Sequence, residues 1–283
     1  MYKSIVYDFF HKVLTWGYFI LIKLVRFKSE FVGCKFLENS FKTSDTIFIL
    51  APGSSINNYS DIDFRHISKH DSIGINNFII HEFKCSLNLL ETQPKDFNYF
   101  NLIREVKKLD NTFLYKGYAS LNTKKFKNFL NNIKDIPNEI KKFYFAKDAY
   151  AKGYWKEIDE NFKSKILNKH KSDFIYNYIS SLNYAVMLSY KLGYRNIVLC
   201  GFDMDNKYFY CENKKYETIV KKYDLCIKSS NNIINDDDDK LKEIFAVLQE
   251  INHMLNSNKN GNISFYYSNK ILSKFFKEYK SEK

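Results

Sequence analysis

Two short turns of small and polar residues carry the groups best suited to chemistry. A Pro-Gly-Ser-Ser turn at residues 52–55 follows an apolar run at 46–50, and a Gly-Phe-Asp turn at 201–203 follows a strand-like run at 195–200. Glycine allows close backbone approach, and serine offers a hydroxyl group with little bulk. A turn after a buried strand also presents backbone N–H groups at a sheet edge where open α/β sheets bind ligands. The two turns therefore predict a ligand site, with plain strand-to-loop turns as the alternative.

Other patterns that could do chemistry are sparse. Asp203 and Asp205 form an Asp-x-Asp pair after a strand, which would suit a metal-dependent transferase. His66 and His70 have i, i+4 spacing but lack the adjacent glutamate and third ligand of a metal site. The sequence contains no Walker A motif and no G-x-G-x-x-G fingerprint. The Asp-x-Asp pair therefore leaves a metal-dependent transferase open as an alternative, and no motif calls for a bound cofactor.

The elements that position these turns must fit within 283 residues, enough for one large domain. A net charge of +12 favours an anionic partner, although a basic surface without a specific partner fits equally well. The five cysteines are an odd number and form no C-x-x-C pair, so we expect no disulfides and a reducing cytosol.

Short apolar runs that end in small or amide residues predict a parallel sheet with one ligand-binding edge. Strands are expected at 46–50, 71–78, 85–90, 112–115, 195–200 and 263–267, and helices at 174–192, 241–255 and 270–279. Residues 57–69 are expected to form a polar connection or a short helix. The predicted fold class is α/β, with a Rossmann-like, mostly parallel sheet flanked by helices.

Three segments differ from this pattern. Residues 1–44 are expected to form an amphipathic, aromatic and basic segment on an anionic membrane surface, with packing on the domain as the alternative. Residues 45–283 are expected to form a single domain. Within it, residues 107–172 predict a helical insertion, and residues 205–239, which lack periodicity, predict a mobile loop or lid.

Taken together, four stretches resemble the bacterial sialyltransferases of glycosyltransferase family 42, the Campylobacter lipooligosaccharide enzyme type. The resemblance covers roughly residues 46–95 and 175–275. It rests on Ala-Pro-Gly-Ser-Ser-Ile at 51–56, Ile-Asn-Asn-Phe at 75–78 and Ser-Ser-Leu at 180–182. The most specific match is Leu-Gly-Tyr-Arg-Asn-Ile-Val-Leu-Cys-Gly-Phe-Asp at 192–203, which aligns without a gap.

The resemblance implies a GT-A-variant fold and a CMP-activated sugar donor bound without metal. It places Gly53, Ser54 and Ser55 along the nucleotide. Asn76, beside Asn77, would contact phosphate or ribose. The cytidine and the donor would be surrounded by Ser180, Ser181 and Gly201, with Phe202 next to them.

The sequence also departs from the family. Pro52 replaces the turn asparagine, and the paired tyrosines that hold the leaving phosphate are out of register, so Asp205, Tyr208 and Tyr210 are their candidate substitutes. The family histidine is missing, because no histidine lies between His170 and His253.

Transfer from a CMP-sugar needs a base that accepts the proton of the acceptor hydroxyl. The candidate carboxylates are Asp203, Glu91 and Asp236. Capping or loop contacts are the alternative for the first two, and a solvated loop is the alternative for Asp236.

The sequence thus predicts a glycosyltransferase that moves sialic acid, a related nonulosonic acid or Kdo to a surface polysaccharide or lipooligosaccharide. It is expected to lie in the cytoplasm, peripheral at the inner face of the cytoplasmic membrane, to bind no nucleic acid, and to be able to form a homo-oligomer. The alternatives are a metal-dependent NDP-sugar transferase, a pyrophosphokinase-like enzyme, and a non-enzymatic basic protein that binds membrane or nucleic acid.

Overall fold

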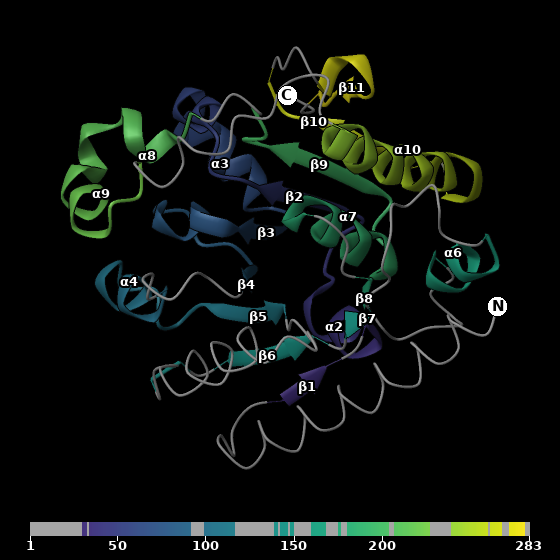
Figure 1. Cartoon of the computed structure of the whole chain (residues 1–283), viewed down its shortest axis with the longest axis horizontal. Helices are drawn as coiled ribbons and strands as arrows, with labels where there is room; N and C mark the ends of the chain where they lie inside the picture. The colour runs from purple at the N-terminus through teal and green to yellow at the C-terminus, as the bar shows by residue number, and fades with distance from the viewer. Residues whose placement is uncertain are drawn as a thin grey trace.

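The chain folds around an all-parallel sheet of nine strands (Figure 1). The computed structural model describes residues 30–32, 34–91, 99–116, 139–140, 142–146, 148–149, 160–167, 175–176, 180–203, 207–226, 239–259, 261–267 and 272–280. In spatial order the strands are β1 (Glu30–Val32), β6 (Lys142–Ala146), β5 (Thr112–Lys116), β4 (Leu87–Glu91), β3 (Asp71–Ile75), β2 (Thr46–Leu50), β9 (Asn196–Cys200), β10 (Asn262–Phe265) and β11 (Lys277–Glu278). A separate two-stranded sheet pairs β7 (Asp148–Ala149) with β8 (Ile175–Tyr176).

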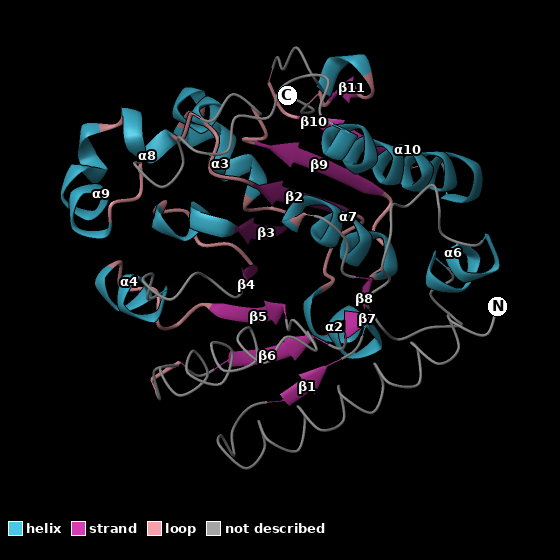
Figure 2. Ribbon diagram, viewed as in Figure 1, coloured by secondary structure: helices cyan, strands magenta, loops and turns pink. Residues whose placement is uncertain are grey.

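Helices flank the sheet (Figure 2). The described α-helices are α2 (Cys34–Phe41), α3 (Asp61–Ile67), α4 (Tyr99–Glu105), α6 (Glu160–Leu167), α7 (Ser181–Lys191), α8 (Phe209–Glu212), α9 (Glu217–Tyr223) and α10 (Asp239–Lys259). Short 3₁₀ helices are η1 (Ser54–Asn58), η2 (Asn76–Ile80), η4 (Lys214–Tyr216) and η5 (Leu272–Lys274). This arrangement confirms the predicted α/β class.

The two faces of the sheet contribute to two separate cores. Along β2, Ile47 and Ile49 point to the core that contains α7 and α10, whereas Phe48 and Leu50 point to the core that contains η2, α4 and α8. Because successive side chains of a strand alternate between faces, a strand buried on both sides must be continuously apolar. This requirement explains why β2 has no polar alternation in the sequence.

The carboxyl ends of three central strands lie level with one another. Leu50 at the end of β2 is opposite Cys200 of β9 on one side and Gly74 of β3 on the other. The turns that follow these strands therefore leave the sheet at the same edge. The α8–α9 region lies beyond this edge in Figure 1, on the side toward which the β9 arrowhead points.

Several sequence-based assignments are corrected. The predicted insertion at 107–172 contributes β5 and β6 to the main sheet; β6 was missed because its aromatic run is only a few residues long. The Tyr144 ring of β6 packs against Phe36 and Phe41 of α2, with ring centroids 5.5 and 5.8 Å apart. The sheet also begins before residue 45, because β1 pairs with β6.

Three further boundaries differ. The helix expected at 174–192 begins only at Ser181, because the Ser180 hydroxyl accepts the N–H of Asn183 and caps it, while residues 175–176 form β8. The closing helix expected at 270–279 is replaced by η5 and β11. In the predicted lid, residues 209–223 form α8, η4 and α9, short helices whose stability comes from tertiary contacts and not from their own periodicity.

Within the described part of the chain, no helix is both long and apolar enough to cross a membrane. The membrane-surface prediction for residues 1–29 falls outside the described residues.

Candidate functional site

The two glycine turns meet at the carboxyl edge of the sheet, as predicted. The N–H of Gly53 donates to the carbonyl oxygen of Gly201 over 2.9 Å. A Cβ atom on Gly53 would lie only 2.3 Å from that oxygen, and a Cβ on Gly201 would lie 2.3 Å from the oxygen of Ala51. Gly201 also has a φ of 71°, in the left-handed region. Both glycines are therefore required by the close backbone packing of the two turns.

The N–H groups of the first turn are not free for a ligand, contrary to the expectation from sequence. The N–H of Ser54 donates to Lys207 O over 3.0 Å, and that of Ser55 donates to the Asp203 carboxylate over 2.6 Å. Asp203 therefore holds the first turn in place. A contact of this kind with a loop was the structural alternative to a catalytic role for Asp203. Its bonded oxygen is Oδ2, and its Oδ1 has no partner among the described residues.

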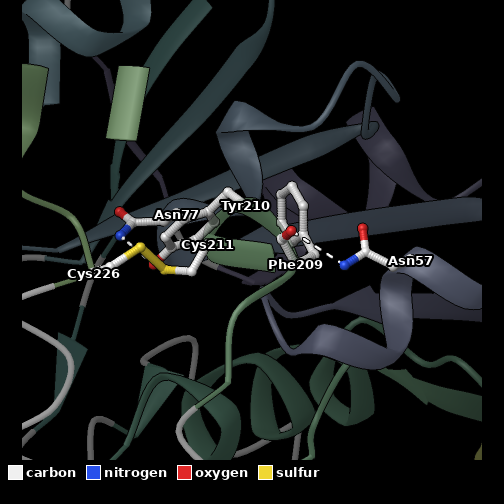
Figure 3. The surroundings of a disulfide bond; sticks show 6 residues. All are labelled: Asn57, Asn77, Phe209, Tyr210, Cys211 and Cys226. Carbon is white, nitrogen blue, oxygen red and sulfur yellow. Dashed lines mark hydrogen bonds between the residues drawn. A yellow bond between two sulfur atoms is a disulfide. The ribbon is translucent and has the colours of Figure 1, made fainter. Parts of the chain in front are cut away.

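Candidate residues from α8 and η2 lie together next to these turns. The Tyr208 and Tyr210 rings stack with centroids 5.4 Å apart, and the Asn77 carboxamide donates to the Tyr210 hydroxyl over 3.1 Å (Figure 3). Burial raises the pKa of Tyr210, so its hydroxyl stays protonated and available as a donor. Tyr208 pairs with Gly53 in an isolated antiparallel bridge, which ties α8 to the first turn.

Unpaired polar groups also face this edge. Asn76 follows β3 with a φ of 51°, a conformation that asparagine tolerates better than most residues. Neither the Asn76 carboxamide nor the Ser55 hydroxyl has a partner within the described part of the chain. Ser180 and the buried Ser181 begin α7. Because α7 ends directly before β9, its first turn lies toward the carboxyl edge of the sheet.

Two polar side chains near this region were not predicted. Asn183, in the first turn of α7, is 2% exposed, and both polar atoms of its side chain lack partners in the described structure. His81 follows η2, stacks on Phe78 at 5.2 Å and contacts the Phe209 ring of α8 at 5.4 Å. Burial lowers the pKa of His81 to about 4, so the ring is neutral. An asparagine in an otherwise apolar helix was the available signal for Asn183.

The remaining candidates are placed less completely. Phe202 is buried in the core that contains α7. Glu91 ends β4, but its side chain lies outside the described residues, as do Asp205 and Asp236. Their proposed roles remain predictions.

The histidine pair packs as part of the fold. His66 and His70 both contact the ring of Phe48, and their polar partners are Tyr279 and Ser44. No cluster of three or more histidine, cysteine, aspartate or glutamate side chains suited to a metal occurs among the described residues.

The cysteine prediction is wrong for one pair. Cys211 of α8 is disulfide-bonded to Cys226, beyond the end of α9 (Figure 3). Cys34, Cys85 and Cys200 are buried and form no disulfide. The short helices between positions 211 and 226 bring the pair together, and residues 211–226 have no periodicity from which to predict these helices.

No family model matches the sequence, and no curated protein matches it. Among solved structures, the chain is similar to the sialyltransferase CstII from Campylobacter jejuni, in complex with a substrate analogue, cytidine-5'-monophosphate. The two are 13% identical, the match covers 82% of this chain and 84% of that one, and the TM-score is 0.41. A likeness at this level assigns no function.

Proposed function

We propose that this protein is a glycosyltransferase that moves an acidic sugar from a CMP-activated donor to a polysaccharide or lipooligosaccharide acceptor, without a metal ion. The sugar class is sialic acid, a related nonulosonic acid or Kdo. The proposal includes a cytoplasmic location, peripheral at the inner membrane face.

One observation carries the proposal. The segments that resemble the sialyltransferase family in sequence are far apart in the chain. Residues 51–56 and 75–78 lie at the ends of β2 and β3, and residues 201–203 of the segment 192–203 follow β9, so all three reach one edge of the sheet. In open α/β sheets this edge is where ligands bind. A chance resemblance would not be expected to collect at the same edge of the fold.

The unpaired polar groups suit a nucleotide monophosphate. The Asn76 carboxamide and the Ser55 hydroxyl can both donate to phosphate or ribose oxygens. The protonated hydroxyl of Tyr210 supplies a further donor, with Tyr208 stacked beside it, and hydrogen bonds to the departing phosphate would stabilise its developing charge. These groups could replace the metal that a diphosphate leaving group usually needs.

Among the three candidate bases, only the Asp203 side chain is described. Its Oδ2 atom is fixed by the first turn, which leaves Oδ1 to accept the proton of the acceptor hydroxyl. We therefore propose Asp203 as the base, with Glu91 and Asp236 as the alternatives to test beside it.

The test is release of CMP from CMP-sialic acid, CMP-Kdo and a CMP-nonulosonic acid, with and without EDTA. We expect one donor to be hydrolysed or transferred at an unchanged rate in EDTA. Asp203→Asn should lower turnover at least about 100-fold with little change in KM if Asp203 is the base. Activity that requires added Mg²⁺, or turnover of UDP- or GDP-sugars only, would overturn the proposal.

The matched binding variant is Asn76→Gly. Glycine keeps the positive φ that alanine would strain, so the substitution removes only the carboxamide. We expect weaker CMP binding with unchanged stability, measured by calorimetry and urea unfolding. Parental affinity in Asn76→Gly would place the nucleotide elsewhere.

A further inference from the structure

A single disulfide joins the two ends of the region that covers the candidate site. We call residues 207–226 the α8–α9 unit. Cys211 lies in α8 and Cys226 lies after α9, 15 residues later (Figure 3). Tyr208 and Tyr210, which we assign to the donor phosphate, belong to the same unit.

The first half of the α8–α9 unit is hydrogen-bonded to the sheet edge. Phe209 N–H donates to Pro52 O over 3.0 Å, and the Asn57 carboxamide donates to Phe209 O over 3.1 Å. The bond from Asn77 to the Tyr210 hydroxyl anchors the second tyrosine. These contacts place Phe209 and Tyr210 at the sheet edge, and the Tyr208 ring stacks on Tyr210.

The second half is held much less firmly. Helix α9 contains no buried residue. Its polar contacts to α4 are the Lys222–Glu105 ion pair and a 3.0 Å bond from the Tyr223 hydroxyl to the same carboxylate, and both lysine and tyrosine lie at the surface or only half-buried. Exposed ion pairs contribute little to stability. Ile219, Val220 and Tyr223 pack against the core but are only partly buried. The disulfide, with the buried Leu225 beside it, joins this half covalently to α8.

The two disulfide-bonded cysteines are more accessible to a reagent than the other described cysteines. Cys211 is exposed and Cys226 is half-buried, whereas Cys34, Cys85 and Cys200 are buried. Burial raises the pKa of Cys85 to about 12 and raises that of Cys200 as well, which leaves almost no reactive thiolate at either residue. Because the other three cysteines form no disulfide, a mild reductant would cleave only the Cys211–Cys226 bond.

We propose that the Cys211–Cys226 disulfide is a redox-controlled latch that holds the α8–α9 unit, and with it Tyr208 and Tyr210, against the sheet edge. An external dithiol supplies two electrons and two protons, cleaves the S–S bond into two thiols and is itself oxidised to a disulfide. A small-molecule disulfide such as oxidised glutathione reverses the exchange. The effect of reduction on CMP binding rests on the proposed function, whereas its effect on the order of the α8–α9 unit does not.

The test is hydrogen–deuterium exchange on the full chain after treatment with oxidised glutathione or with dithiothreitol. Reduction should speed exchange of amides in the α8–α9 unit about tenfold or more and leave β2 and β9 unchanged. The matched control is the Cys211→Ser/Cys226→Ser double variant, which should exchange at the reduced rate with or without dithiothreitol. Mass spectrometry after alkylation should find two new thiols on reduction, at these positions.

The second part of the experiment measures CMP affinity by calorimetry for the parent and the double variant, each treated with oxidised glutathione or with dithiothreitol. Reduction should weaken binding about tenfold in the parent and have no effect in the double variant. Equal exchange rates in the two redox states, or equal CMP affinity despite faster exchange, would overturn the latch. If no sample binds CMP, the proposed function fails, and the exchange result alone decides whether the disulfide orders the unit.

Discussion

For single residues, the clearest feature of the candidate site is that backbone contacts hold its two turns together. Gly53 and Gly201 are glycines because their backbones touch, and the Asp203 carboxylate accepts the N–H of Ser55 in the same turn. The sequence pattern assigned both glycines to ligand approach, and that role stays a prediction, whereas the structure shows them in contact with each other. Neighbouring residues accept the N–H groups of Gly53, Ser54 and Ser55, so the proposed function assigns nucleotide binding to side chains such as Asn76.

The contact between glycines makes a direct prediction. Gly53→Ala places a methyl group 2.3 Å from a backbone oxygen and 2.5 Å from the Asp203 carboxylate, neither of which can easily move. We expect a loss of about 1–3 kcal/mol in the free energy of unfolding. Ser54→Ala is the control, with an expected change within about 0.5 kcal/mol. Urea unfolding of both variants checks this, and equal stability of Gly53→Ala and the parent would contradict it.

At the scale of elements, the most specific sequence match is explained largely by folding. Gly193 ends α7 with a φ of 83°, and the next residue, Tyr194, donates its hydroxyl to the buried carboxylate of Asp71 over 2.9 Å. Asp71 also accepts from Thr43 and Ser44. This unit fixes the start of β9 beside β2 and β3, far along the strand from the candidate site.

Tyr194→Phe tests the role of this unit. The substitution keeps the ring but removes one hydrogen bond from a buried carboxylate, which should cost about 1–3 kcal/mol of stability. CMP affinity should not change, because Tyr194 lies at the opposite end of β9 from Gly201. Urea unfolding and calorimetry together check both parts; a large affinity loss with full stability would contradict the structural role.

Elements with a clear apolar signal were predictable from the sequence, and the others were not. Strands β2, β3, β4, β5, β9 and β10 contain buried apolar residues in short runs, and helix α10 contains them at helical spacing. By contrast, β6 is a short aromatic strand in lysine-rich sequence, and α8 and α9 are only 4 and 7 residues long. Their stability comes from contacts with distant segments, which local pattern cannot reveal.

At the scale of the whole molecule, the neutral His81 ties stability to pH. The ring lies among Phe64, Phe78 and Phe209, between η2 and α8. Burial, then the Lys108 charge, lowers the pKa from 6.5 to about 4. The unfolded chain therefore binds the proton first as pH falls, and the folded state loses stability between these two values.

We expect the free energy of unfolding to fall as pH drops from about 6.5 to about 4, by roughly 2–3 kcal/mol from this residue. His81→Asn keeps an acceptor for the Phe83 N–H but cannot titrate in this range. Urea unfolding across this pH range should give a flatter curve for the variant. A curve parallel to that of the parent would show that His81 is not the cause.

The net charge of +12 favours an anionic ligand, and the common carboxyl edge of β3, β2 and β9 is where we expect it to bind. The most direct measurement is calorimetric titration of the full chain with CMP, CDP, UDP and ATP, each with and without Mg²⁺. Our account predicts that CMP binds most tightly and that EDTA leaves its affinity unchanged. Binding of ATP only with Mg²⁺, or of no nucleotide at all, would contradict it.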